Sequence, residues 1–188
     1  MALGKSRIKT NIKGGGALKL RMLSPTPADT FSDAGYLNST DVDDVRNMME
    51  SSDERGLVID YLEGSSAPVL RSVLKQSGID EITLVKDADG KYYEAYYAVT
   101  TKEGKVQEYD FFIVKIKPGA VLKFAAATER TIELEMHMLA VNASASITRN
   151  PVAYNMDPAV NPYYVLTENA TAQGAPADTG ATVKAAIF

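Results

Sequence analysis

Between residues 80 and 141, short apolar runs alternate with turn-forming dipeptides, and this spacing restricts the chain to a small set of folds. The turns recur about every 8–12 residues, which is typical of β-sandwiches and barrels. The runs predicted to be strands are residues 81–86, 92–99, 106–116, 121–126 and 131–141. The intervening turns are predicted at Asp89-Gly90, Glu103-Gly104, Pro118-Gly119 and Glu129-Arg130. We therefore predict a mainly β fold, an antiparallel two-sheet sandwich or barrel.

The strand predicted at 131–141 has the most regular alternation. Its apolar positions are Ile132, Leu134, Met136 and Met138. Its polar positions are Thr131, Glu133, Glu135 and His137. Because successive side chains of a strand point to opposite faces, one face is expected to be core and the other exposed.

Two further strands are predicted before residue 80, at 17–22 and 57–62, each rich in apolar residues. Residues 24–36 are predicted to be mainly loop, because Pro25 and Pro27 lack the N–H that strand pairing needs. The acidic stretch 38–55 has some helical spacing but few strong helix formers, and we predict a long, weakly structured loop.

One helix is predicted, over residues 67–77. Pro68 would lie in its first turn, after a serine cap, and Gly78 would end it. Its apolar stripe comprises Val69, Leu70, Val73 and Leu74. Such a short amphipathic helix is expected to flank the sheet, because it needs an apolar surface to cover.

The 188 residues are enough for one proper core. We predict a flexible basic N-terminal arm over 1–15, a β domain over 16–141 and an extended C-terminal arm over 142–188. The C-terminal stretch is rich in Ala, Thr, Asn and Pro and poor in charge. It is expected to pack on its own domain or on a neighbour, with a frayed end as the alternative.

The net charge of −4 is unevenly distributed. Residues 1–23 hold six basic residues and no acid, whereas residues 29–63 hold ten acids and two arginines. This split favours head-to-tail association of copies, although two solvated faces would also explain it. The candidate interface residues are Lys5, Arg7, Lys9, Lys13, Asp41, Asp43, Asp44, Arg46, Met48 and Met49.

Four tyrosines on the strand predicted at 92–99 would place rings on both of its faces: Tyr92, Tyr93, Tyr96 and Tyr97. Both faces are then expected to be at least partly covered. Ordinary strand composition would explain these tyrosines. The functional hypothesis is a subunit interface, and the candidate interface residues are Tyr93 and Tyr97. Base stacking is the least favoured, because acids lie nearby.

No arrangement of residues predicts catalysis. The chain has no cysteine, no Gly-x-Ser-x-Gly motif and a single histidine, His137, which is in line with two glutamates on one strand. Asp87-Ala88-Asp89-Gly90 lacks the remaining ligands of a calcium loop and predicts a hairpin turn with positive φ at the glycine. We therefore expect no enzyme activity, no metal and no cofactor. No apolar stretch is long enough to predict a membrane span.

The order of these parts resembles that of bacteriophage tail tube proteins: a basic N-terminal segment, a strand, an acidic excursion with Asp33-Ala34-Gly35-Tyr36-Leu37, and a helix before a strand meander. It is also similar to the tube protein of type VI secretion and related injection machines. The resemblance covers about residues 16–141. It implies hexameric rings that stack around a lumen for DNA.

The resemblance further implies which residues and partners are involved. Glu133, Glu135 and His137 would face an acidic lumen along which DNA slides without specific binding, and the loop at 38–55 would reach an adjacent subunit. Partners would be other copies and other tail proteins, namely a tape measure protein, a terminator and a sheath where one exists. The protein would be assembled in the host cytoplasm and reside in the virion.

Three alternatives remain open at this stage. The chain could be a monomeric or small-oligomer β-barrel binding module, or another virion part such as a decoration or connector protein. A cofactor-free hydrolase would need a carboxylate pair such as Asp43/Asp44 or Glu133/Glu135. No pair lies in an apolar setting that would raise one pKa, which disfavours this last alternative.

Overall fold

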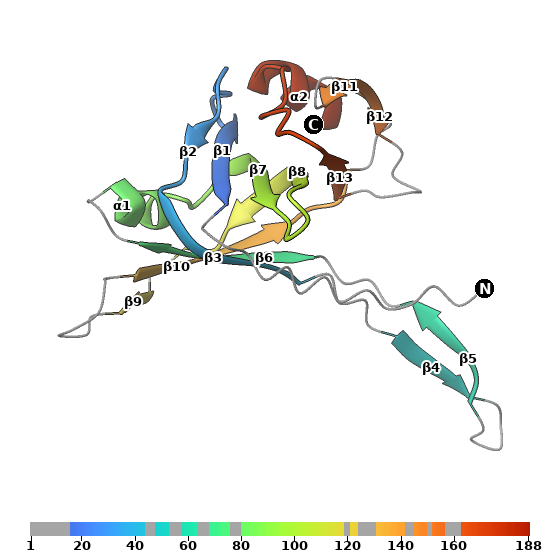
Figure 1. Cartoon of the computed structure of the whole chain (residues 1–188). Helices are drawn as coiled ribbons and strands as arrows, with labels where there is room; N and C mark the ends of the chain where they lie inside the picture. The colour runs from blue at the N-terminus through green and yellow to red at the C-terminus, as the bar shows by residue number, and fades with distance from the viewer. Residues whose placement is uncertain are drawn as a thin grey trace.

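The computed structural model describes residues 16–43, 48–52, 58–63, 68–75, 80–118, 121–123, 131–141, 145–149, 152–156 and 163–188. In these residues the architecture is mainly β, as predicted (Figure 1). The first strands are β1 (Ala17–Ser24), β2 (Ser32–Asp33), β3 (Tyr36–Asp43), β4 (Met48–Ser52), β5 (Val58–Glu63) and β6 (Val69–Lys75). The later strands are β7 (Tyr92–Thr100), β8 (Val106–Ile116), β9 (Val121–Lys123), β10 (Thr131–Met138), β11 (Ala145–Arg149), β12 (Val152–Met156) and β13 (Tyr164–Asn169). The helices are α1 (Asp80–Lys86) and α2 (Gly180–Ile187).

Nine of these strands form one antiparallel sheet, in the order β2-β1-β7-β8-β10-β6-β3, with β13 also on β8 and β9 also on β10. Strand β8 joins its two halves. Over residues 106–111 it lies between β7 and β13, whereas its end, residues 114–116, pairs with β10. One continuous sheet therefore takes the place of the predicted two sheets or barrel.

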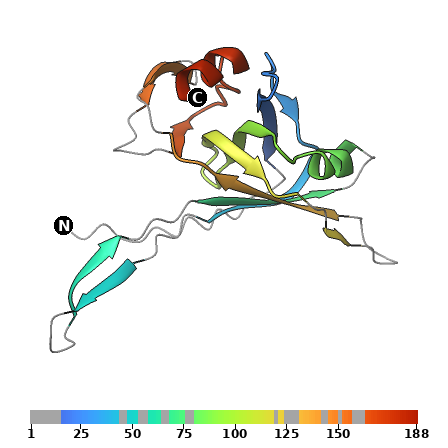
Figure 2. The same cartoon turned by 180° about the vertical axis from the view of Figure 1, so that it is seen from behind.

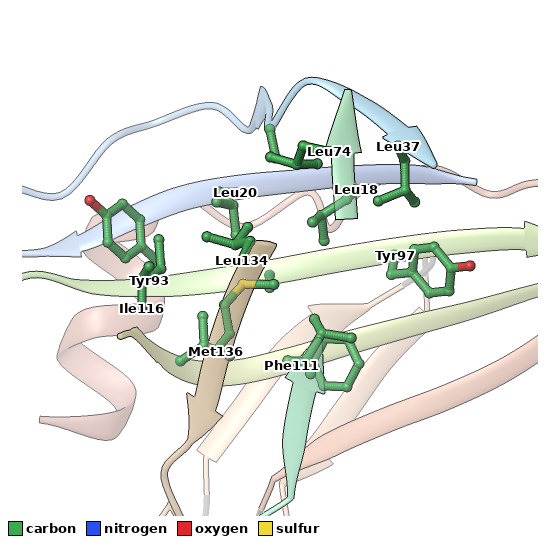
Figure 3. Packing of buried hydrophobic residues seen from close by; sticks show 14 of the residues in the cluster. Leu18, Leu20, Leu37, Leu74, Tyr93, Tyr97, Phe111, Ile116, Leu134 and Met136 are labelled. Atoms are coloured by element: carbon green, nitrogen blue, oxygen red, sulfur yellow. The ribbon is translucent and has the colours of Figure 1, made fainter. Parts of the chain in front are cut away.

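The two halves of the sheet face each other across the hydrophobic core (Figures 1 and 3). We call β1, β2, β7, β8 and β13 the first half, and β3, β6, β9 and β10 the second half. From the first half, Leu18, Tyr93 and Phe111 enter the core, and they meet Leu74 and Met136 of the second half. The predicted alternation of β10 is confirmed: its buried residues are Ile132, Leu134, Met136 and Met138.

The strand predicted at 81–86 is wrong, because these residues belong to helix α1. Val85 and Ala88 are buried in the core, and Ile82 packs against it. These three residues are spaced by three positions, which suits one face of a helix. The sequence pattern alone does not separate a strand from a helix in so short a run. The predicted turn at 87–90 follows this helix instead of joining two strands, and the positive φ of Gly90 is confirmed at 69°.

The helix predicted at 67–77 is also wrong, since β6 occupies residues 69–75 between β10 and β3. Its inward residues are Leu70, Ser72 and Leu74, and this alternation includes a serine. The hydroxyl of Ser72 lies 3.0 Å from that of Thr40 on β3, which satisfies it inside the core. The sequence pattern hid the strand because a buried serine interrupts the apolar period.

The acidic stretch predicted as a loop at 38–55 instead contains strands β3 and β4. Strand β3 pairs with β6, while β4 pairs with β5 in a separate two-stranded ribbon. This ribbon, which we call the hairpin, projects away from the rest of the domain (Figures 1 and 2). Residues 24–36 are mainly irregular as predicted, apart from the two-residue strand β2 and the end residues, which belong to β1 and β3.

The C-terminal segment, residues 163–188, lies on the first half of the sheet. Strand β13 pairs with β8, and α2 lies against β1. Strands β11 and β12 form a second ribbon, close to α2. The stretch predicted as an extended arm thus contributes one strand to the main sheet, and it also contains a helix. Among the described residues, no helix has the length and apolar character to cross a membrane.

Candidate functional site

The outward side of the second half carries a group of charged residues, which we call the charged face. Its members come from β3, β6 and β10 and from the residue that follows β8, and they are Asp41, Asp43, Arg71, Lys117, Glu133, Glu135 and His137. Strand register brings them together: Arg71 of the central strand is opposite Asp41 on one side and Glu135 on the other. The predicted lumen-facing residues Glu133, Glu135 and His137 therefore do share one face.

Glu135 is the centre of an ion-pair network on this face. Its Oε1 atom lies 2.8 Å from Nε2 of His137 and 3.2 Å from Nζ of Lys117, and its Oε2 atom lies 3.8 Å from Nε of Arg71. Nη1 of Arg71 also donates to Oδ2 of Asp43 at 3.0 Å. Arg71 and Lys117 thus offset carboxylates, and the face carries mixed charge.

Desolvation raises the pKa of Glu135, but hydrogen bonds and charge from Lys117 and His137 outweigh it and hold that pKa below its ordinary value. A lowered carboxyl pKa contributes stability above the pKa of the unfolded chain, and this contribution is lost as the pH falls through the folded pKa. Glu135 is therefore ionised at neutral pH. Its role on this face is that of a fixed negative charge.

The remaining predicted interface residues fall into three groups. Tyr93 and Tyr97 are 7% and 3% exposed, so their rings pack in the core of their own chain and not on a subunit surface. Burial of Tyr97, and to a smaller extent charge from Tyr109, raises the pKa of Tyr97 to about 12. Met48 and Met49 are the first residues of the projecting β4. The residues that lie outside the described ranges are Lys5, Arg7, Lys9, Lys13, Asp44 and Arg46.

A second polar group, on the outward side of the first half, was not predicted. We call it the buried polar cluster, and its members are Arg21, Glu94, Tyr96, Glu108 and Asp110, each at most 2% exposed. They come from the adjacent strands β1, β7 and β8. The sequence signal that could have revealed this cluster is the presence of charged residues in the middle of apolar strands, because buried charges require partners and a covering segment.

Arg21 contacts Glu94, Asp178 and Phe31. Its Nε donates to Oε2 of Glu94 at 2.9 Å, its Nη2 contacts the same oxygen, and its Nη1 donates to the carbonyl of Asp178. The guanidinium carbon also lies 4.4 Å from the ring centroid of Phe31. A charge-assisted pair thus ties β1 to β7 and to the C-terminal segment.

Glu108 accepts four hydrogen bonds. The Tyr96 hydroxyl and the backbone N–H groups of Gln173 and Gly174 donate to Oε1, the latter two at 2.9 Å, and Asn169 Nδ2 donates to Oε2 at 3.2 Å. Burial is the main cause that raises the pKa of the Tyr96 phenol, and its hydrogen bond to Glu108 raises that pKa further. The phenol therefore remains protonated and donates, and Glu108 anchors the turn that leads to α2.

Gly180 begins α2 at a close approach to the chain after β1. Its N–H donates to the carbonyl of Ala28 at 3.0 Å, and an added Cβ would lie 2.3 Å from that oxygen. We expect Gly180→Ala to destabilise the fold by about 1–3 kcal/mol, because backbone would have to shift. Urea unfolding measures this, with exposed Ala185→Ser of the same helix as the control. Equal stability of the two variants would contradict the tight packing.

These two groups differ in what they can do. In the described part of the chain, no group of three or more His, Asp or Glu side chains is arranged to hold a metal ion. The buried polar cluster is covered by the C-terminal segment, and its contacts fix that segment in place. The charged face has no such cover in the described part of the chain, and Arg71, Lys117 and His137 are exposed on it.

No protein-family model matches the chain, and no curated protein matches it in sequence.

Proposed function

We propose that the chain is a structural subunit that assembles into stacked rings forming the tube of a phage tail, a conduit for DNA. The observation that carries this proposal is the projecting hairpin. Its strands have five and six residues, and among the described strands they pair with each other alone. An isolated two-stranded ribbon is at best marginally stable in water, so a surface of another copy would complete it.

The edge of the sheet supports the same proposal. Strand β3 is eight residues long and, within the described ranges, pairs with β6 alone. A long open edge offers unpaired N–H and C=O groups to another strand. Closure into a ring would pair such edges between neighbours and leave none exposed, which is a common solution for identical subunits.

The charged face gives the proposed lumen its properties. It lies on the second half, next to the open edge of β3, so edge pairing between subunits would extend it around a ring. Its carboxylates, with Glu133 exposed, would repel DNA phosphates, while Arg71 and Lys117 moderate that repulsion. Such a surface favours passage over tight binding. Other tail proteins, such as a tape measure, a terminator and a sheath, would be further partners.

Replacing residues 48–63 with a two-residue Asn-Gly turn is the sharpest test of the proposal. We expect the unaltered chain to form rings or hollow tubes at high concentration, and the variant to remain monomeric, because it lacks the hairpin that reaches the neighbour. Negative-stain electron microscopy and light scattering measure both. The folded body should survive, since β3 and β6 are retained and the residues left between their paired ends, Asp43 and Val69, still join them.

The control changes another hairpin in the same chain. Lys102 and Glu103, exposed in the turn between β7 and β8, are both replaced with serine, and this variant should assemble as the unaltered chain does. A monomeric unaltered chain at every concentration would refute the proposal. Tubes formed by the variant without residues 48–63 would show that the hairpin is not the connecting element.

A further inference from the structure

The charged face and the C-terminal segment lie on opposite sides of the domain (Figures 1 and 2). The charged face is the outward side of β3, β6 and β10, while β13 and α2 belong to or cover the first half. The hydrophobic core separates them. A subunit that turns one of these surfaces toward a lumen must therefore turn the other away from it.

The C-terminal segment is firmly attached on its side. Beyond its bonds to Arg21 and Glu108, Nζ of Lys184 donates to the carbonyl of Pro25 at 3.2 Å. The ring of Phe188 packs edge-on against Tyr92, with centroids 5.6 Å apart. A second apolar cluster, built around Phe112, Ile113, Val141 and Val165, includes Ala186 and Ile187 of α2. The position of the segment in a subunit is thus defined by side chains on three strands.

The exposed side of this segment differs in chemistry from the charged face. In α2 the exposed positions are Ala181, Thr182 and Ala185, all uncharged. Phe188 follows with 62% exposure, the largest among the exposed large hydrophobic residues described. A surface of small uncharged residues beside an aromatic ring is suited to contact with protein more than with DNA phosphates.

We infer that in the assembled tube the C-terminal segment forms part of the outer wall and that the charged face forms the inner wall. This inference rests on the proposed tube. It gives the segment a role separate from assembly: it closes the buried polar cluster on one side and faces outward on the other.

The absence of cysteine from the sequence allows a direct test by thiol labelling. Ala185→Cys reports on the C-terminal segment, and His137→Cys reports on the charged face; both positions are exposed in the single chain. Each variant is labelled before and after assembly with a small maleimide and with a polyethylene glycol maleimide too bulky to enter the lumen. Before assembly, both thiols should react with both reagents.

After assembly, we expect Ala185→Cys to keep its labelling by the bulky reagent, and His137→Cys to lose it while still reacting with the small one. The reverse pattern would overturn the inference and leave the tube intact. Loss of bulky labelling at both positions would also overturn it, because the segment would then lie between subunits. Absence of tubes in electron micrographs of the unaltered chain would be a failure of the proposed function itself.

Discussion

Arg21→Met is expected to lower the free energy of unfolding by about 3–5 kcal/mol, because it leaves the buried carboxylate of Glu94 without its cation. Arg21 and Glu94 are 1% and 0% exposed, so water cannot take the place of the lost partner. The substitution also removes the donor to the carbonyl of Asp178. Urea unfolding, followed by circular dichroism, measures the difference.

The control for this prediction is Lys19→Met on the same strand. Lys19 is 38% exposed and lies 4.0 Å from Asp33, so its loss should cost no more than about 0.5 kcal/mol. Adding Glu94→Gln to Arg21→Met should recover part of the loss, because it removes the uncompensated charge. Equal stability of the Arg21 and Lys19 variants would show that the buried pair contributes nothing.

Glu108→Ala is expected to cost about 3 kcal/mol, because the buried Tyr96 hydroxyl and three part-buried donors lose their acceptor, and a buried donor left unpaired costs about 1–3 kcal/mol by itself. Two of those donors are backbone N–H groups at residues 173 and 174. The loss should therefore be concentrated in the C-terminal segment. Hydrogen exchange should accelerate over residues 163–188 and remain slow in β6 and β10.

Glu168→Ala is the matched control in the same segment. Its carboxylate is partly exposed, and hydrogen bonds from Lys105 and Gln107 hold its pKa below the ordinary value. Water can replace those bonds, so the change should leave hydrogen exchange of the segment as it was. If Glu108→Ala behaved like this control, Glu108 would not be the anchor of the segment.

Strands β1, β7, β8 and β10 follow from the sequence because their apolar and polar residues alternate or their apolar runs end at clear turns. The short elements do not. In β6 a serine occupies a core position and is satisfied by Thr40, a partner 32 residues away. In α1 the apolar residues are too few to separate a helical period from a strand.

The two polar groups differ in how far the sequence reveals them. Glu133, Glu135 and His137 share a face by the alternation of one strand, which is a local property. Arg71 and Lys117 join them by strand register, which the sequence does not state. The buried polar cluster depends on still more distant residues: Arg21 bonds to Asp178, 157 positions away, so its cover could not be inferred from its neighbours.

The long distance along the chain between Arg21 and Asp178 determines when their contact can form during synthesis. A chain folds as it leaves the ribosome, amino end first, and pairings between distant residues form late. Strand β1 can pair with β7 early, but Arg21 and Glu108 meet their remaining partners when residues 163–188 have emerged. Until then the nascent chain exposes charges that are buried in the folded domain. Emergence of residues 163–188 is thereby the step that lets the domain reach its final shape, because these residues complete the bonds of Arg21 and Glu108.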